Sequence, residues 1–504
     1  MLSELLHWGQ EKEKDMKTST RILVGLALGI LGAVLYIFAF QPYSIWLLAF
    51  VAYIPMLIAE QRILPMRWSG LGRGLGVGLF LMVFLPAVFG MGTVPWIFII
   101  VVAVIFLVSL LTTPALRAFH ERTGLRWFVL QGALDVAGIE MVRSFIPVIR
   151  THAFFAQTMY AQPWMLQGVS VFSVYGLSLL ILLVNYALAL GFLLAFDNKW
   201  RFDGQPALDR SMSFRWMTAV AALFVLWAGF GVTTLATAPK DPATVRVAAI
   251  QHGFAKPGHQ DPDGQLERLA VLSEQTRIAA GQGARFIVWP EISLGFDPQV
   301  EHTAELQALA KETNAYILIG YGVDMPNGDW RNEAVMLMPS GEFSSVYGKN
   351  FPSEPGEPRI VSAGVYPVWD TELGNLATIV CNDVNFTKTI RTAVRNGAQI
   401  VSVPTFEVFG PGIGWEQRTQ VVLRAVENRV SIVKAEAAGV SVIVDPYGRI
   451  VAQAKFPVGT ANALVADVPL GTGGTPYNRL SDWMGWVTLV GMVGFSVVTS
   501  RKQK

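Results

Sequence analysis

Residues 166–196 read LQGVSVFSVYGLSLLILLVNYALALGFLLAF and contain no aspartate, glutamate, lysine or arginine. About 20 mainly apolar residues are enough for a helix to cross the hydrocarbon core of a bilayer. This run therefore predicts a membrane-spanning helix. The composition of the whole chain agrees, because 52% of its 504 residues are hydrophobic and only 15% are charged, whereas soluble domains usually carry about 25% charged residues.

Seven more apolar runs approach the length of a membrane span. They are residues 22–40, 44–60, 74–91, 95–115, 127–147, 216–237 and 483–499. Most charged residues fall between residues 243 and 467. We therefore expect an N-terminal membrane domain of seven spans at 1–239, a water-facing domain at 240–475, and a C-terminal span with its tail at 476–504. No small-residue cleavage site follows the first run, which favours a retained helix over a signal peptide.

Basic residues lie in alternate loops between these runs, and loops rich in lysine and arginine face the cytoplasm. With eight spans, every basic loop falls on one side, so both termini are expected to be cytoplasmic and residues 240–475 extracytoplasmic. The opposite loops 41–44 and 90–95 have no basic residue. The basic residues are Lys12, Lys14, Lys17, Arg21, Arg62, Arg67, Arg73, Arg117, Arg122, Arg126, Lys199, Arg201, Arg210, Arg215, Arg501, Lys502 and Lys504.

From about residue 244 the pattern changes to short apolar runs that alternate with helical patterns. The runs 245–250, 285–289, 317–320, 376–380, 400–403, 431–435 and 439–444 predict buried strands, and 264–280 and 414–430 predict helices. Strands that alternate with helices favour a layered α/β domain, in which active residues gather at the ends of strands.

Two of these runs, and a hairpin-like stretch that ends at residue 349, lead into a side chain that can take part in catalysis. The sequence FIVWPE ends in Glu291, YGK ends in Lys349, and TIVC ends in Cys381, the only cysteine of the chain. A cysteine is a strong nucleophile only as thiolate; a desolvated glutamate can take its proton, and a nearby lysine can stabilise an oxyanion. A lone cysteine forms no internal disulfide, and the alternative to a nucleophile is a buried, inert thiol.

In order and spacing, Trp-Pro-Glu291, Lys349 and Cys381 resemble the Glu-Lys-Cys triad of the nitrilase superfamily. The resemblance implies a four-layer α-β-β-α sandwich, with Glu291 as general base, Lys349 as electrostatic stabiliser and Cys381 as nucleophile. Two of the three residues also have ordinary alternatives. Glu291 could cap the following helix, and Lys349 could be a solvated turn residue.

A nitrilase-like domain inserted before the last of eight spans resembles the bacterial apolipoprotein N-acyltransferase family. This resemblance implies that Glu357 buttresses the site, and it extends to Glu140 and Arg143 in the fifth run. The alternatives are a surface pair of Glu357 with Arg359, and a structural ion pair of Glu140 with Arg143 in place of a functional membrane cavity. Further resembling residues are the stretch AFQPY at 39–43, Trp46, Gln157, Gln167, Tyr175, Gly176 and Asn185.

Two segments depart from the family's pattern. An aromatic residue and a glutamate usually follow the family's cysteine, whereas this chain has Asn382 and Asp383. Asp383 keeps the charge; it is expected either to support the site or to satisfy nearby amides. The family's Asn-Asp-x-Trp-Phe-Gly segment is replaced by TFEVFG at 405–410, and Trp415 with the stretch RAVE at 424–427 partly restores the match. The altered segment leaves a different acceptor open.

The resemblance implies an N-acyltransferase of the bacterial cytoplasmic (inner) membrane. A phospholipid would donate an acyl group to Cys381, and the resulting thioester would acylate the α-amine of a diacylglyceryl-cysteine lipoprotein, without a cofactor. The alternatives are a membrane-anchored amidase, an acyltransferase with another amine acceptor, and a transporter or scaffold whose outer domain only binds ligand. The net charge of +2 gives no support for nucleic-acid binding, and the histidines lack metal-ligand spacing, so no metal is expected.

Overall fold

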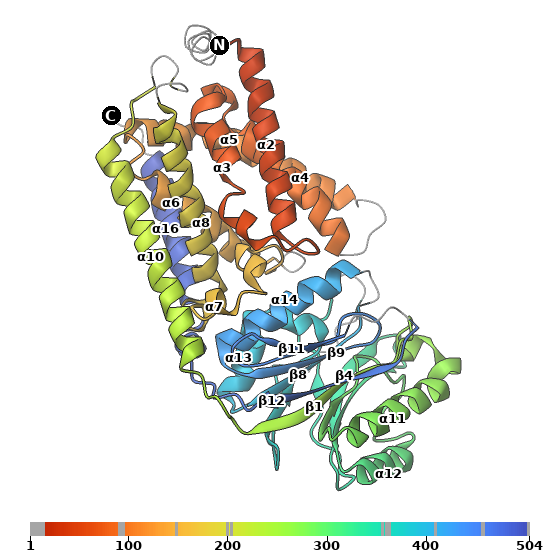
Figure 1. Cartoon of the computed structure of the whole chain (residues 1–504). Coiled ribbons are helices and arrows are strands. Elements are labelled where there is room, and N and C mark those ends of the chain that lie inside the picture. The colour runs from red at the N-terminus through yellow and green to blue at the C-terminus, as the bar shows by residue number, and fades with distance from the viewer. Residues whose placement is uncertain are drawn as a thin grey trace, which may run out of the picture.

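The computed structural model describes residues 16–88, 96–146, 150–197, 201, 205–353, 357, 364–407, 411–454 and 459–500. It has two parts, a group of long apolar helices and an α/β domain beneath them (Figure 1). Several expectations fall on residues outside these ranges. They concern Lys12, Lys14, the loop at 90–95, Lys199, Arg359, positions 408–410 of the altered segment, Arg501, Lys502 and Lys504.

Among the described residues, seven helices are long and apolar enough to cross a membrane. The second of them, Trp46–Ile63, is irregular, because it consists of three short helical pieces, η2 (Trp46–Phe50), α3 (Ile54–Ile58) and η3 (Ala59–Ile63). The other helices are α2 (Thr18–Ala39), α4 (Leu71–Val88), α5 (Trp96–Arg122), α8 (Val169–Ala195), α10 (Arg210–Ala236) and α16 (Trp483–Ser500).

The fifth expected span corresponds to α6 (Phe128–Arg143), which has 16 residues and is shorter than the run at 127–147. At 1.5 Å per residue it is about 24 Å long, somewhat less than the hydrocarbon core. It packs along α8 and α16, and most of its residues are buried. In its described residues the membrane part therefore has seven segments long enough to cross a membrane, and α6 is a shorter, mostly enclosed helix beside them.

The α/β domain contains two six-stranded sheets that pack face to face. The first has the order β12-β1-β2-β3-β4-β5 and the second β11-β10-β9-β8-β7-β6. The expected strands are all present, and the sequence did not indicate β4, β6, β11 and β12. The bounds are β1 (Thr244–Gln251), β2 (Phe286–Val288), β3 (Tyr316–Asp324), β4 (Trp330–Leu337), β5 (Tyr347–Gly348), β6 (Val368–Thr371), β7 (Gly374–Thr378), β8 (Ile400–Thr405), β9 (Ser431–Glu436), β10 (Val442–Val444), β11 (Ile450–Gln453) and β12 (Asn462–Pro469).

Helices cover the outer face of each sheet, which confirms the α-β-β-α sandwich (Figure 1). Helices α11 (Gln265–Gly281) and α12 (Thr303–Thr313) pack on the first sheet, and α13 (Thr387–Arg395) and α14 (Pro411–Asn428) on the second. Val433 and Ala435 of β9 point into the layer between the sheets, whereas Ile432 points towards α14. This alternation is that of a strand buried on both faces.

Helix α14 belongs to both parts of the molecule. It packs on β9 and β10 of the second sheet and also on α4 and α8 of the membrane part. As a result, one apolar core runs from the membrane helices through α14 into the sheet; it includes Leu177 of α8, Val422 of α14 and Val401 of β8. Helix α14, part of the outer layer of the sandwich, thus also packs against the helices of the membrane part. The domain limits at residues 239 and 475 remain predictions.

The two glycines of α10 provide a matched test of the helix packing. An added Cβ at Gly231 would lie 1.7 Å from the carbonyl oxygen of Trp164, whereas one at Gly229 would meet nothing within 4 Å. Both Gly→Ala changes raise helix propensity by about 1 kcal/mol. We expect Gly229→Ala to keep or raise the Tm in detergent and Gly231→Ala to lower it by several degrees. Equal Tm values would show that α10 does not pack as described.

Candidate active site

Cys381 lies just after β7, at the first position of the short helix η8 (Cys381–Asn385). Its φ angle is 45°, in the left-handed region that costs a side-chain-bearing residue energy. The side chain is 7% exposed. Its sulfur accepts a hydrogen bond from Nε2 of Gln417 on α14, at 3.5 Å. A strained backbone thus presents the only thiol of the chain at the end of a buried strand, beneath α14.

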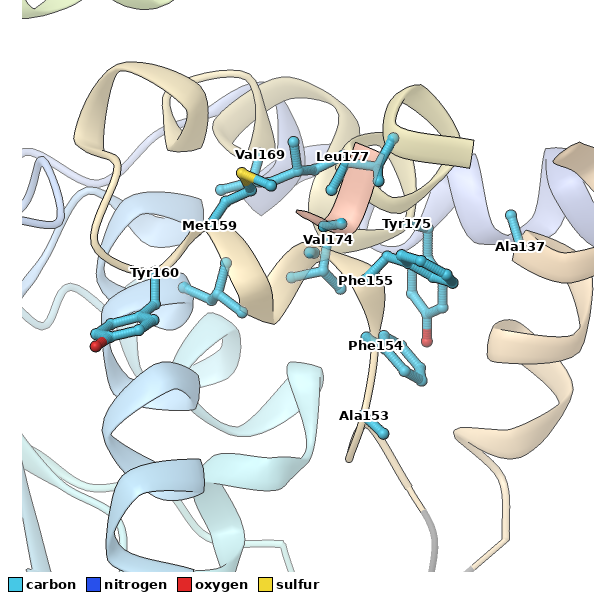
Figure 2. Close-up of a cluster of buried hydrophobic side chains, with 14 of the residues drawn as sticks. Ala137, Ala153, Phe154, Phe155, Met159, Tyr160, Val169, Val174, Tyr175 and Leu177 are labelled. Carbon is cyan, nitrogen blue, oxygen red and sulfur yellow. The ribbon is translucent and has the colours of Figure 1, made fainter. Parts of the chain in front are cut away.

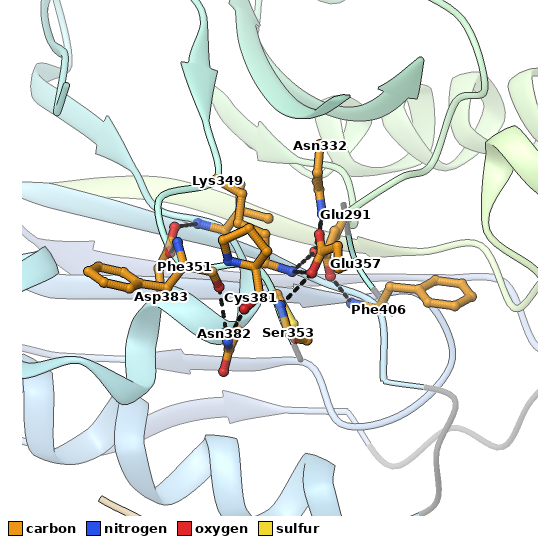
Figure 3. Close-up of polar contacts among 12 residues, drawn as sticks. Glu291, Asn332, Lys349, Phe351, Ser353, Glu357, Cys381, Asn382, Asp383 and Phe406 are labelled. Atoms are coloured by element: carbon orange, nitrogen blue, oxygen red, sulfur yellow. Dashed lines mark hydrogen bonds and ion pairs between the residues drawn. The ribbon is translucent and has the colours of Figure 1, made fainter. Parts of the chain in front are cut away.

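Lys349 follows β5, and its ammonium is buried between two carboxylates (Figure 3). Its Nζ lies 2.8 Å from Oε1 of Glu291 and 2.7 Å from Oε2 of Glu357. Glu357 therefore contacts the lysine directly. Figure 3 shows Glu291, Lys349 and Cys381 gathered at one place, so the structure brings the expected triad together.

Glu291 stands beyond the end of β2 and is held by more than the lysine. Asn332 of β4 donates from Nδ2 to Oε1 of Glu291 at 2.7 Å, and also to Oε1 of Glu357 at 2.5 Å. The backbone N–H of Phe406, which follows β8, donates to Oε2 of Glu291 at 2.9 Å. Both oxygens of the carboxylate are thereby fixed in direction.

Burial and charge set the protonation states of the three groups. Burial raises the pKa of Glu291, and the Lys349 ammonium only partly opposes this. Burial also raises the pKa of the Cys381 thiol well above its usual value, and the Glu291 charge adds to the effect. Burial would lower the pKa of Lys349, but Glu291 and Glu357 raise it well above its usual value. The resting site therefore holds a neutral thiol, a charged lysine and a carboxylate of increased basicity.

Asp383 connects the cysteine turn to the loop that carries the lysine. Its Oδ2 accepts from the Tyr347 hydroxyl at 2.6 Å and from the Val380 N–H at 3.1 Å, and its Oδ1 accepts from the Phe351 N–H at 2.7 Å. Of the two expectations for Asp383, the structure shows the second: its carboxylate accepts hydrogen bonds from nearby backbone amides. One of those amides belongs to the cysteine turn and the other to the lysine loop, so Asp383 also fixes the position of the loop relative to the turn.

Glu140 and Arg143 do not form the ion pair considered above, since no such pair joins them in the described part of the chain. Instead, Oε1 of Glu140 accepts from the Phe155 N–H at 2.9 Å, and Arg143 donates to the carbonyl oxygen of His152. Both residues thus hold the segment that leads from Arg150 to Tyr160. Figure 2 shows part of this segment packed beside Tyr175 and Leu177 of α8.

The same segment reaches the catalytic domain. The Arg150 guanidinium donates to Oδ1 of Asn382, the residue after the cysteine, and lies 4.4 Å from the Phe386 ring centroid. Thr151 Oγ1 donates to the carbonyl oxygen of Asn385 at 3.0 Å. The membrane part therefore holds η8 in place. Sequence patterns could not indicate these contacts, because they join residues more than 230 positions apart.

A second buried charged group lies near the site. Nζ of Lys434 on β9 is 3.2 Å from Oε2 of Glu407 and 3.0 Å from Oε2 of Glu436. Oε1 of Glu436 accepts the Glu407 N–H at 2.7 Å. The sequence marks for this group are Glu407 in the altered segment at 405–410, Lys434 within the run 431–435 and Glu436 directly after it. Among the described residues, no three His, Cys, Asp or Glu side chains are arranged to hold a metal ion.

Comparison with known proteins gives matches in both halves. The family described as Carbon-nitrogen hydrolase matches residues 246–475, and the Apolipoprotein N-acyltransferase N-terminal domain matches residues 32–187. The apolipoprotein N-acyltransferase of Geobacter metallireducens is 26% identical over 94% of this chain and 95% of its own. That of Chlorobaculum tepidum is 25% identical over 68% of this chain and 71% of its own. An amidase structure from Nesterenkonia sp. is 26% identical and covers 45% of this chain and 92% of its own, with a TM-score of 0.37.

Asn332 offers a test of how the carboxylate of Glu291 is tuned. Its hydrogen bond favours the charged form and so lowers the pKa of Glu291. In Asn332→Ala this pKa rises, and Glu291 stays protonated to a higher pH. If Glu291 takes the thiol proton, the rate at which iodoacetamide alkylates Cys381 should fall on the acidic side of its pH profile. In Asn332→Ala, the pH of this fall should be higher by about one unit. Alkylation reports on Cys381 alone, because the chain has no other cysteine.

Asn327→Ala is the control, because Asn327 is an exposed turn residue away from the carboxylates. It should leave the pH profile of alkylation unchanged. Alkylation that falls at the same pH in Asn332→Ala as in the wild type, in a protein of unchanged Tm, would show that this hydrogen bond does not tune the base.

Proposed function

We propose that this chain, which belongs to the apolipoprotein N-acyltransferase family, transfers an acyl group from a phospholipid to the α-amine of a lipoprotein through a thioester on Cys381. The observation that carries the proposal is the contact of Lys349 with two carboxylates beside the thiol, at the base of a membrane domain. This arrangement provides a base, a fixed positive charge and a nucleophile in a place that lipids can reach.

In the first half-reaction, Glu291 takes the thiol proton as the sulfur attacks the ester carbonyl of the phospholipid. A C–S bond forms, and the Lys349 ammonium stabilises the negative oxygen of the tetrahedral intermediate. The C–O bond to glycerol then breaks. Glu291 returns its proton to the departing oxygen, which leaves as the hydroxyl of a lysophospholipid. Cys381 now carries the acyl group as a thioester.

In the second half-reaction, the neutral α-amine of the lipoprotein attacks the thioester carbonyl. The C–N bond forms, the C–S bond breaks, and the amine loses one proton to Glu291, which passes it to the sulfur. An α-amine has a pKa of about 8, so a useful fraction is neutral at ordinary pH. The ester of the donor supplies the driving force, and the reaction as written consumes no cofactor.

A mostly apolar cavity supports a lipid substrate. It has a volume of about 340 Å³ and lies between the ends of α2 and α4 and the first turns of α14. Phe40 and Phe84 line its membrane side, and Trp415 lines its α14 side. Cavities of this size bind ligands mainly through apolar surface. Trp415, Glu416 and Thr419 of α14 line this one, and Gln417 of the same helix contacts Cys381.

Acylation of Cys381 gives a direct test. Purified protein incubated with a phospholipid that carries a labelled acyl chain should acquire the label on Cys381, and Cys381→Ala should acquire none. Addition of a lipoprotein peptide with a free α-amine should move the label to the amine, as read by mass spectrometry of its N-terminus. Expression in a bacterium that lacks lipoprotein N-acylation should restore the modification with the wild type and not with Cys381→Ala.

Other outcomes distinguish the alternative functions. Release of the label as a fatty acid, at the same rate with and without the peptide, would indicate a membrane-anchored amidase. A labelled thioester that reacts with other amines but not with the lipoprotein peptide would indicate a different acceptor. Absence of any label from folded wild-type protein would remove the enzymatic proposal and favour a ligand-binding scaffold.

We also propose that both termini face the cytoplasm and that the α/β domain faces away from it. The distribution of basic residues supports this orientation, and the short helix α6 must then cross the membrane. The proposal places the thiol at the extracytoplasmic surface of the bacterial cytoplasmic membrane.

Cysteine labelling tests this orientation, because Cys381→Ala leaves a cysteine-free chain. In that background, Ser340→Cys introduces a thiol on an exposed turn of the α/β domain, and Ser211→Cys introduces one at the start of α10. A maleimide that cannot cross membranes should label position 340 in intact spheroplasts and position 211 only after lysis. The reverse pattern would invert the proposed topology.

A further inference from the structure

The second buried charged group, made of Lys434, Glu407 and Glu436, has no part in the chemistry described so far. All three side chains are at least 96% buried. Glu436 is saturated, since it accepts from the Thr405 hydroxyl at 2.8 Å and from the Glu407 N–H, besides its pair with Lys434. Glu407 is not, because its Oε1 has no hydrogen-bond partner in the described residues. Leaving a buried carboxylate oxygen unpaired costs free energy, and such an atom requires an explanation.

The charges of this group do not balance. Two carboxylates face one ammonium, so the group has one negative charge too many when both acids are ionised. Burial and the neighbouring Glu436 raise the pKa of Glu407 well above its usual value, although Lys434 opposes this. In the resting protein the missing positive charge is therefore a proton on Glu407. A cation that carries its own hydrogen-bond donors can replace that proton.

The group lies beside the reacting sulfur. Phe406, the residue before Glu407, donates its N–H to Glu291, and Glu407 is close enough that its ionised form would raise the pKa of the Cys381 thiol. Helix α14 covers both places, because Gly414 approaches Glu407 and Gln417 contacts the sulfur. Gln417 is 2% exposed, and its Oε1 also lacks a partner among the described side chains. Among the described residues, one unpaired acceptor oxygen thus belongs to the amide that contacts the Cys381 sulfur, and a second belongs to a carboxylate that acts electrostatically on the thiol.

We infer that Glu407, assisted by Oε1 of Gln417, binds the ammonium form of the acceptor amine next to the thioester. This inference rests on the proposed acyl transfer and specifies how its second substrate is recognised. A primary ammonium has three N–H donors, and the two free oxygens are acceptors only. The negative charge of the carboxylate attracts a cationic amine and gives no such attraction to neutral water. The site therefore selects the amine over water.

The proton balance follows from this arrangement. When the ammonium binds, Glu407 gives its acidic proton to solvent and becomes a carboxylate. It then takes one proton from the ammonium, which leaves a neutral amine with its lone pair free to attack the thioester carbonyl. The C–N bond forms, the C–S bond breaks, and the second amine proton goes to Glu291 and from there to the sulfur. Glu407 ends in the neutral state in which it began.

The test separates the two half-reactions and compares two nucleophiles. Wild type, Glu407→Gln and Glu407→Asp are first loaded with a labelled acyl chain from phospholipid. The thioester is then exposed to a lipoprotein peptide with a cationic α-amine, or to hydroxylamine, which is uncharged at neutral pH. Glu407→Gln should load within about twofold of wild type, but its transfer to the peptide should fall by about 10- to 100-fold, the effect of losing a charge-assisted hydrogen bond.

The KM for the peptide should rise in Glu407→Gln, while cleavage by hydroxylamine should stay within about twofold of wild type, because no ammonium is bound in that reaction. Glu407→Asp keeps the charge and should retain part of the peptide transfer. Equal transfer to the peptide in all three proteins would overturn the inference. So would an equal loss with both nucleophiles, or a loss of loading, since Glu407 would then act on the thiol or on the fold. Failure of the wild type itself to load would instead remove the proposed function.

Discussion

A buried ammonium must be compensated by negative charge, and this requirement governs the site around Lys349. Isolated charges are expensive in a low-dielectric interior, so the lysine needs Glu291 and Glu357 close to it. Those two carboxylates in turn need donors, which Asn332 supplies to both. The residues come from the ends of β2, β4 and β5 and the loop after Lys349. Loss of a charged member leaves a buried charge uncompensated, and loss of Asn332 removes a donor from both carboxylates, so these residues depend on one another.

The position of this site relative to the membrane depends on α14. In a free-standing sandwich the outer helix would present a polar face to water. Here α14 is buried on both sides, by the sheet and by α4 and α8, and its polar residues make specific contacts with the membrane part. Glu416 pairs with His152 at 3.0 Å, and Arg418 donates to the Tyr160 hydroxyl at 2.9 Å. The membrane part is thus a structural component of the catalytic domain, and through α14 it lies close to the Cys381 thiol.

The sequence predicted the spans, the central strands and the triad, because each has a local signal: long apolar runs, short apolar runs, and reactive side chains at strand ends. Edge strands such as β6 and β11 are short and half-exposed, so their composition resembles that of loops. Asn332 looks like any strand asparagine until the fold places it between two glutamates. The structural ion pair of Glu140 with Arg143, one of the two alternatives for these residues, is absent from the described residues, because backbone groups between Arg150 and Tyr160 bind both side chains.

The two lysine-centred groups have the same composition and therefore the same electrostatic property. Lys349 has Glu291 and Glu357; Lys434 has Glu407 and Glu436. Each group is one positive charge short of neutrality, and in a dry interior that deficit can be filled by a proton or a cation. In the proposed mechanism, the deficit beside the thiol provides a base for the sulfur, and the deficit beside the thioester provides a binding place for the amine. In the proposed reaction a thiol and then an amine must each lose a proton, and each loss uses one of these groups. The first group lies at the ends of β2 and β5 in one sheet, and the second lies on β9 and just beyond β8 in the other sheet.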